Sequence, residues 1–132
     1  NVKITGTWAS KVFSKLTVYD KAEVNSLEVN AMTVKVRDVN STSTVQDSDY
    51  VLRCIQNQAI TITLPPKNTN QGRVLIFKDA LGNANSNNVT ITGDGSDTID
   101  GNANYVINDN KEAVTLICDG INGWMRVSRI VP

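Results

Sequence analysis

Histidine is absent from this sequence of 132 residues. A Ser-His-Asp or Cys-His catalytic group therefore cannot form within the chain, and the side chain that most often transfers protons near neutral pH is missing. Only two cysteines are present, so the Cys and His ligands of a four-ligand zinc site are too few. We therefore expect no catalytic residue, no metal site and no cofactor.

Charge of one sign is not in excess either. Thirteen Lys and Arg residues balance thirteen Asp and Glu residues, and no basic block occurs. A surface that follows the phosphates of DNA or RNA needs such a block, so nucleic acid is not an expected partner. A signal peptide and a membrane-spanning apolar run are also lacking. Because the sequence begins at Asn1 rather than at Met, we expect it to be the C-terminal piece of a longer protein.

Aromatic residues make up only 5% of the chain, whereas Asn and Thr are abundant. Thr favours half-exposed strands and Asn favours turns, so the composition predicts an all-β fold with polar turns. From Tyr50 onward about eight short strands alternate with turn clusters, and no segment favours a helix. The predicted strands lie in YVLRCI (50–55), AITITL (59–64), RVLIF (73–77), VTITG (89–93), around Ile99, and in YVI (105–107), AVTLIC (113–118) and WMRVSRIV (124–131). The continuous segment RVLIF is expected in the centre of a sheet.

Three large or sulfur-containing residues are candidates for the core. Cys54 and Cys118 lie within apolar segments. Free cysteine packs like a small apolar residue, which favours two buried thiols over a disulfide between neighbouring strands. Trp124 follows a tight connection at 119–123 that is rich in Asp, Asn and Gly, and large aromatic side chains bury the most area. Trp124 is therefore expected to anchor the core.

The segment before Tyr50 repeats a unit of an apolar residue, a polar residue and Val. As a helix, this region has a short 3-4-3 apolar spacing that Asp20 and Asp38 interrupt. As a strand, each unit places two apolar side chains on one face, and the abundance of Val and Thr favours strands. The units are Leu16-Thr17-Val18, Ala22-Glu23-Val24, Leu27-Glu28-Val29 and Met32-Thr33-Val34.

A single chain with so few units cannot bury this narrow apolar stripe. Three copies around a common axis could cover one another, so we predict a short trimeric β-repeat shaft over residues 12–41. The alternative is a hairpin packed on the globular part. The sequence thus predicts an arm at 1–45 and a β-sandwich knob at 46–132. The predicted trimer interface consists of Leu16, Val18, Val24, Leu27, Val29, Met32 and Val34.

Several turn and core motifs between residues 59 and 127 resemble those of a known family. The first motif is a strand that ends in Leu64-Pro65, and the second is a strand that is preceded by Gly72-Arg73 and followed by KDALG (78–82). The other two motifs are NVTITGDGSDTIDG (88–101) and VTLICDGINGW (114–124). These motifs resemble the C-terminal knob, or head, domain of trimeric tailed-bacteriophage fibres and tail needles. The resemblance implies a jelly-roll or TNF-like knob that forms a homotrimer. The long helical shaft of a needle is not found in this chain, so tail needle, tail fibre and head fibre all stay open.

Two clusters of polar residues are candidates for catalysis or metal binding. Asp94, Asp97 and Asp100 lie in the turn cluster at 93–102. Paired carboxylates can cleave glycosidic bonds, but Asp beside Gly is typical of a tight turn, and that interpretation is favoured. Asp100, Asn102 and Asn104 have the oxygen spacing that opens an EF-hand loop, but the Gly and the bidentate Glu of that loop are missing. A polar turn is again favoured over a calcium site.

Four cationic residues border the most apolar strands: Arg73, Lys78, Arg126 and Arg129. In a trimer they could face the axis or a subunit boundary and contact an anion or another small ligand. Solvated strand ends or salt bridges between subunits are the favoured alternative.

The sequence therefore predicts a structural protein rather than an enzyme. We expect the trimeric tip of a phage tail needle or fibre, located in the virion, which contacts the host cell envelope during attachment or genome delivery. Other tail or capsid proteins would bind through a region upstream of Asn1. The alternative is a carbohydrate-binding, lectin-like module in which only Tyr50, Tyr105 or Trp124 could stack on a sugar. An enzyme acting on envelope polysaccharide has the least support.

Overall fold

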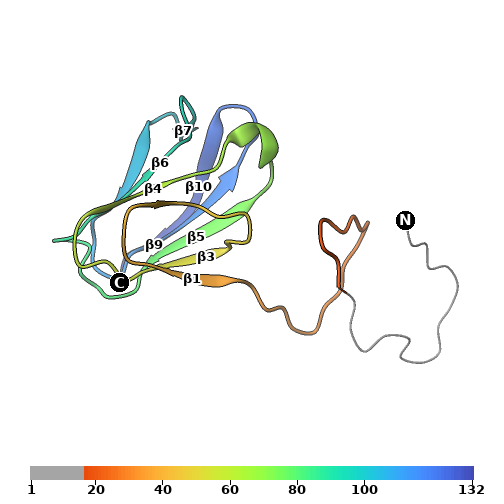
Figure 1. Cartoon of the computed structure of the whole chain (residues 1–132), viewed down its shortest axis with the longest axis horizontal. Helices are drawn as coiled ribbons and strands as arrows, with labels where there is room; N and C mark the ends of the chain where they lie inside the picture. Colours follow the sequence, from red (N-terminus) through yellow and green to blue (C-terminus); the bar gives the residue numbers. More distant parts are fainter. Residues whose placement is uncertain (1–16) are drawn as a thin grey trace, which may run out of the picture. The chain divides into compact units, whose positions relative to one another are not determined.

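The computed structural model describes residues 17–132 (Figure 1). Contacts divide the chain into two units, Asn1–Met32 and Thr33–Pro132. Within residues 17–32 no strand or helix forms, and every regular element of the described chain belongs to the second unit. Two of its strands, β1 and β2, lie before residue 46.

Ten short strands and one 3-10 turn make up the regular structure of the described residues, so the expected all-β class is confirmed. Each apolar segment predicted from Tyr50 onward contains one strand, and Ile99 ends a strand of two residues. The elements are β1 (Val36–Val39), β2 (Ser43–Thr44), β3 (Val51–Cys54), β4 (Ile60–Thr63), η1 (Lys67–Thr69), β5 (Val74–Asp79), β6 (Val89–Thr92), β7 (Thr98–Ile99), β8 (Asn104–Ile107), β9 (Ala113–Cys118) and β10 (Gly123–Ile130).

The strands form two sheets (Figure 1). The chain alternates between these sheets from β1 to β8. The six-stranded sheet has the order β1-β3-β5-β9-β10-β7, and the four-stranded sheet has the order β2-β4-β6-β8. As predicted for a continuous apolar segment, β5 lies inside its sheet, between β3 and β9. Two sheets around a shared core are compatible with the predicted β-sandwich.

The direction of the strands differs from that of a jelly roll, in which neighbours run antiparallel. Five of the eight pairings here are parallel: β1 with β3, β3 with β5, β2 with β4, β4 with β6, and β7 with β10. The physical reason is the alternation between sheets. From β1 to β6, the chain leaves one sheet, passes through a strand of the other sheet and returns beside its previous strand in the same direction, as a crossover connection requires.

The core lies between the sheets and is built from alternate residues of the strands. Phe77 of β5 is fully buried, and Trp124 of β10 is 1% exposed, which confirms that Trp124 anchors the core. Cys54 and Cys118 are buried free thiols, as predicted. Burial raises the pKa of Cys54 to about 12, so that this thiol stays protonated.

The connection before Trp124 is a tight turn, as the residues at 119–123 predicted. One carboxylate oxygen of Asp119 accepts hydrogen bonds from the backbone N–H groups of Ile121, Asn122 and Gly123, at 2.7, 2.9 and 2.9 Å. An added Cβ at Gly123 would lie 2.2 Å from the carbonyl oxygen of Thr98, so only glycine allows β7 and β10 to approach this closely.

Candidate functional site

The apolar stripe of the arm is exposed in the described residues. Val29 is 53% exposed, Leu27 71% and Met32 70%, and Val18 and Val24 are also exposed. Val34 is half-buried, and Leu16 lies outside the described residues. The short strands expected at 17–35 are not formed in the single chain. A strand needs a neighbour to accept its backbone hydrogen bonds.

The outer face of the six-stranded sheet is apolar as well, and we call it the apolar face. Because paired residues in adjacent strands point to the same side of a sheet, the register identifies its rows. One row contains Val36, Val51 and Ile76 and continues into Thr115 and Ser128. The next row contains Val74, Ile117 and Met125. A third row is more polar and contains Asp38, Arg53 and Lys78.

Several residues of the apolar face are strongly exposed. The values are 48% for Val36, 41% for Met125 and 63% for Ile130, and Val127, which neighbours them in β10, is 52% exposed. Val127 lies at the irregularity where the register of β10 shifts between Arg126 and Ser128. Clusters of exposed apolar side chains of this kind mark surfaces that contact another molecule.

The outer face of the four-stranded sheet has the opposite character. Its rows contain Thr61 beside Thr90, and Thr63 beside Thr92, all half-buried. Their core-facing neighbours, such as Ile62 and Ile91, are fully buried. A threonine face is compatible with water, so the two outer faces of the unit Thr33–Pro132 differ in polarity.

The apolar face was not predicted from the sequence, although the sequence carries a signal for it. The segment RVLIF is apolar at consecutive positions, and consecutive positions of a strand point to opposite faces. Leu75 and Phe77 point into the core, and Val74 and Ile76 point outward. A continuous apolar strand is typical of a sheet that is covered on both faces.

The four candidate cations are not brought together into one site. Arg73 Nη2 donates to the carbonyl oxygens of Gln46, Asp47 and Asp49, at 2.6, 3.1 and 3.2 Å. Lys78 donates to the carbonyl oxygen of Lys111. Both cations therefore have partners in the loops of their own chain.

The other two cations lie on β10. The Arg126 guanidinium lies 5.1 Å from the centre of the Tyr105 ring. Arg129 Nε donates to a carboxylate oxygen of Glu112 at 2.9 Å, and the Tyr105 hydroxyl donates to the same carboxylate. Burial raises the pKa of Glu112, but the hydrogen bonds from Arg129 and Tyr105 lower it by more, so its pKa lies below the ordinary value.

A second ion pair fixes the beginning of the six-stranded sheet. Arg37 of β1 donates from Nε and Nη2 to the two carboxylate oxygens of Asp49, at 2.8 and 2.6 Å. The backbone N–H of Gln46 donates to the same carboxylate at 2.8 Å. Burial raises the pKa of Asp49, but the Arg37 guanidinium and the Gln46 N–H lower it below its ordinary value. β1 is thus tied to the turn that leads into β3.

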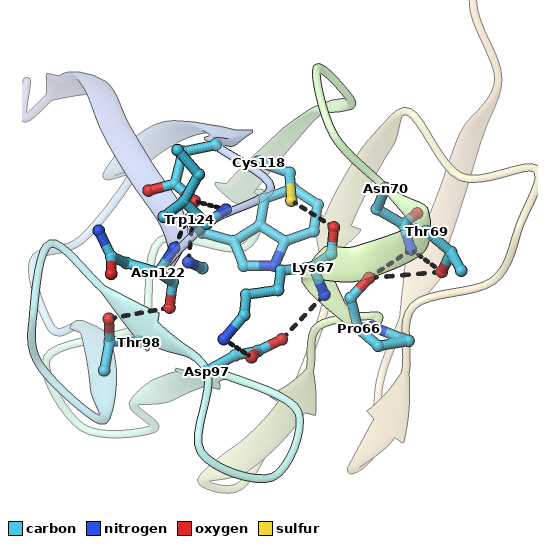
Figure 2. Close-up of polar contacts among 12 residues, drawn as sticks. Pro66, Lys67, Thr69, Asn70, Asp97, Thr98, Cys118, Asn122 and Trp124 are labelled. Atoms are coloured by element: carbon cyan, nitrogen blue, oxygen red, sulfur yellow. Dashed lines mark hydrogen bonds and ion pairs between the residues drawn. The ribbon is translucent and has the colours of Figure 1, made fainter.

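One end of the sandwich carries a hollow of about 280 Å³ between two loops, which we call the polar hollow. Its lining consists of Pro66, Lys67, Asn68, Asp94, Gly95, Ser96 and Asp97. Lys67 Nζ contacts one carboxylate oxygen of Asp97 at 2.9 Å, and the Lys67 backbone N–H donates to the other at 2.8 Å (Figure 2). Burial raises the pKa of Asp97, but these contacts with Lys67 lower it by more, to below the ordinary value.

The polar hollow lies beside the core residue Trp124. Figure 2 shows its indole ring near Lys67 and Cys118, and the indole N–H donates to the carbonyl oxygen of Pro65 at 3.3 Å. The Cys118 thiol donates to the carbonyl oxygen of Lys67 at 3.6 Å. The loop that begins at Pro65 is therefore attached both to the core, through Trp124 and Cys118, and to Asp97.

The three aspartates of the turn cluster have separate environments. Asp97 is paired with Lys67, Asp94 is exposed, and Asp100 accepts hydrogen bonds from the backbone N–H of Arg126, at 3.3 Å to each oxygen. Among residues 17–132 no three His, Cys, Asp or Glu side chains gather as metal ligands do. In the same range no helix has the length and apolar character needed to cross a membrane.

Comparison with known proteins does not assign the chain to a family: no family model matches it, and no curated protein matches it in sequence.

Proposed function

We propose that this chain is the structural tip of a bacteriophage tail needle or tail fibre. Three copies associate through the apolar stripe of the arm and through the apolar face, and the assembled knob contacts the host cell envelope during attachment or genome delivery. The observation that carries the proposal is the exposure of these two apolar surfaces in a single chain. The motifs between residues 59 and 127 support the phage assignment by resemblance.

The two apolar surfaces follow one another along the chain. Met32, Val34 and Val36 alternate with polar residues, and Val36 is the first residue of the apolar face. Alternate residues of an extended chain lie on one side. A neighbour that covers the stripe up to Val34 would therefore also reach the edge of the face. Copies related by threefold rotation bury such heterologous surfaces in a closed ring.

The proposed role needs no catalytic residue. A tip transmits force and resists proteases, and both properties depend on the free energy of assembly rather than on a reactive group. The missing histidine is in keeping with this role.

Sedimentation equilibrium tests the assembly. At micromolar concentration the full chain is expected to sediment as three copies of its 14.4 kDa mass. Val29→Asp places three carboxylates near one axis, where burying a charge is costly, and should dissociate the trimer. Asn30→Asp adds the same charge at the neighbouring position and serves as its control. A wild-type chain that stays monomeric would refute the proposed assembly.

The apolar face is tested in the same way with a second pair of variants. Met125→Lys adds a charge to the apolar face, and Thr90→Lys adds one to the threonine face. Only the first variant should weaken association.

The location is tested on phage particles that carry the protein, where a gold-labelled antibody against residues 46–132 should mark the tail or fibre tip in electron micrographs. Labelling of the capsid alone would contradict the proposed location.

A further inference from the structure

We propose that the polar hollow binds a single pyranose sugar. This inference goes beyond the structural role above and does not depend on trimer formation, because all residues that line the hollow belong to the two loops 66–68 and 94–97 of one chain. It assigns a ligand class to one end of the sandwich.

The hollow is formed before any ligand arrives. Asp97 is 8% exposed and holds the two loops together through its two contacts with Lys67. The loop itself is tight, because an added Cβ at Gly93 would lie 2.0 Å from the carbonyl oxygen of Asp97. The Asp97 N–H also donates to the carbonyl oxygen of Asp94 at 2.9 Å. A preformed site does not lose affinity through the ordering of its loops.

The rim of the hollow carries polar groups that are free to bind. Asn68, Asp94 and Ser96 are exposed, and their side chains make no hydrogen bond to any other residue in 17–132. The Asn68 amide can donate and accept, the Ser96 hydroxyl can do both, and the Asp94 carboxylate can accept two hydrogen bonds. Such a set fits adjacent hydroxyl groups, each of which is both a donor and an acceptor. The exposed Pro66 ring offers an apolar contact for the C–H face of a sugar ring.

The charges around the hollow disfavour an ionic ligand. The ammonium group of Lys67 is offset by Asp97, and Asp94 leaves an excess negative charge that repels phosphate and carboxylate ligands. A divalent cation is usually held by several carboxylates. Asp97 is already paired with Lys67, which leaves Asp94 as the one free carboxylate of the lining. A neutral ligand with many hydroxyl groups remains. The volume of about 280 Å³ lies below the roughly 300–1,000 Å³ of sites for drug-sized molecules, which limits the ligand to about one ring.

Saturation-transfer difference NMR on the full chain tests the proposal. Glucose, galactose, mannose and N-acetylglucosamine are titrated separately, and at least one should bind with a dissociation constant of about 1 mM, as expected for a few hydrogen bonds in a small open site. The double variant Asn68→Ala/Ser96→Ala should weaken that binding by roughly tenfold. The matched control is Asn85→Ala/Ser86→Ala, which removes an exposed Asn-Ser pair from the loop after β5 and should leave binding unchanged.

Three results would overturn the proposal. The first is that none of the four sugars gives a signal at tens of millimolar. The second is that the sugar signal of Asn68→Ala/Ser96→Ala is as strong as that of the wild type. The third is that the control Asn85→Ala/Ser86→Ala loses the signal as much as Asn68→Ala/Ser96→Ala does. Inorganic phosphate is titrated in parallel, and tighter binding of phosphate than of every sugar would also refute a neutral ligand. The variant residues are exposed, so thermal unfolding should match the wild type, and sedimentation reports separately on the trimer.

Discussion

The stripe of the arm allows a quantitative test of assembly through Leu27→Ala. Full burial of a Leu side chain contributes about 1.5–3 kcal/mol. Leu27 is 71% exposed, so its burial between copies would contribute about 1–2 kcal/mol per chain. Alanine retains little of the Leu side chain, so the substitution removes most of this burial free energy. The loss occurs in each of the three chains of the trimer. The trimer should lose about 3–6 kcal/mol, which corresponds to roughly two to four powers of ten in its association constant.

The assay is sedimentation equilibrium over a range of concentrations, in which the midpoint between monomer and trimer is compared for the two proteins. Glu28→Ala is the matched control, because Glu28 follows Leu27 directly and points to the other side of an extended chain. The free energy of unfolding of the globular unit should change by less than about 0.5 kcal/mol in both variants, since both residues are exposed. Equal midpoints for Leu27→Ala, Glu28→Ala and the wild type would refute the assignment of the stripe to the interface.

Two further predictions concern the globular unit. Trp124→Ala removes a side chain that is 1% exposed and should lower the free energy of unfolding by about 3–5 kcal/mol in urea titrations. Ile121→Ala, at a position that is 73% exposed, should change this free energy little. Similar effects of the two variants would show that Trp124 does not anchor the core. The pKa values of Asp49, Asp97 and Glu112 are lowered in the folded state, so their stabilisation is complete above the ordinary values of 3.8 and 4.5 and is lost as the pH falls through and below them. Urea titrations between neutral pH and about pH 3 should show this loss, and Glu112→Gln should flatten the curve; a wild-type stability that rises on acidification would contradict the assigned ion pairs.

Local patterns of the sequence were enough to locate most strands. In AITITL, apolar and polar residues alternate with the period of a strand, and the structure forms β4 there with Ile60 and Ile62 buried. The turn at 119–123 was predictable because its Asp, Asn and Gly residues favour tight turns through local hydrogen bonds and positive φ angles. Burial of Cys54 and Cys118 followed in the same way from the apolar segments around them.

The pairing of strands could not be deduced in this way. A strand pattern specifies which side chains face the core, but it carries no information on which strand lies beside it or in which direction. The jelly-roll expectation came from the alternation of short strands with turns and from a resemblance, and it implied antiparallel neighbours, whereas β1, β3 and β5 run parallel in the structure. Their order depends on contacts between residues far apart in the chain, and these form only when the whole core assembles.

The amino-acid sequence by itself determined the all-β class, the positions of the strands from Tyr50 onward and the unusual stripe of the arm, because each depends on periodicities within a few residues. Only the tertiary structure decided that Lys67 meets Asp97 across 30 positions, that Val36, Ile76 and Ile117 share one apolar face, and that Arg73 and Arg129 have separate partners. The reason is that such sites are built from side chains that the fold, and not their neighbours in the chain, brings within contact distance.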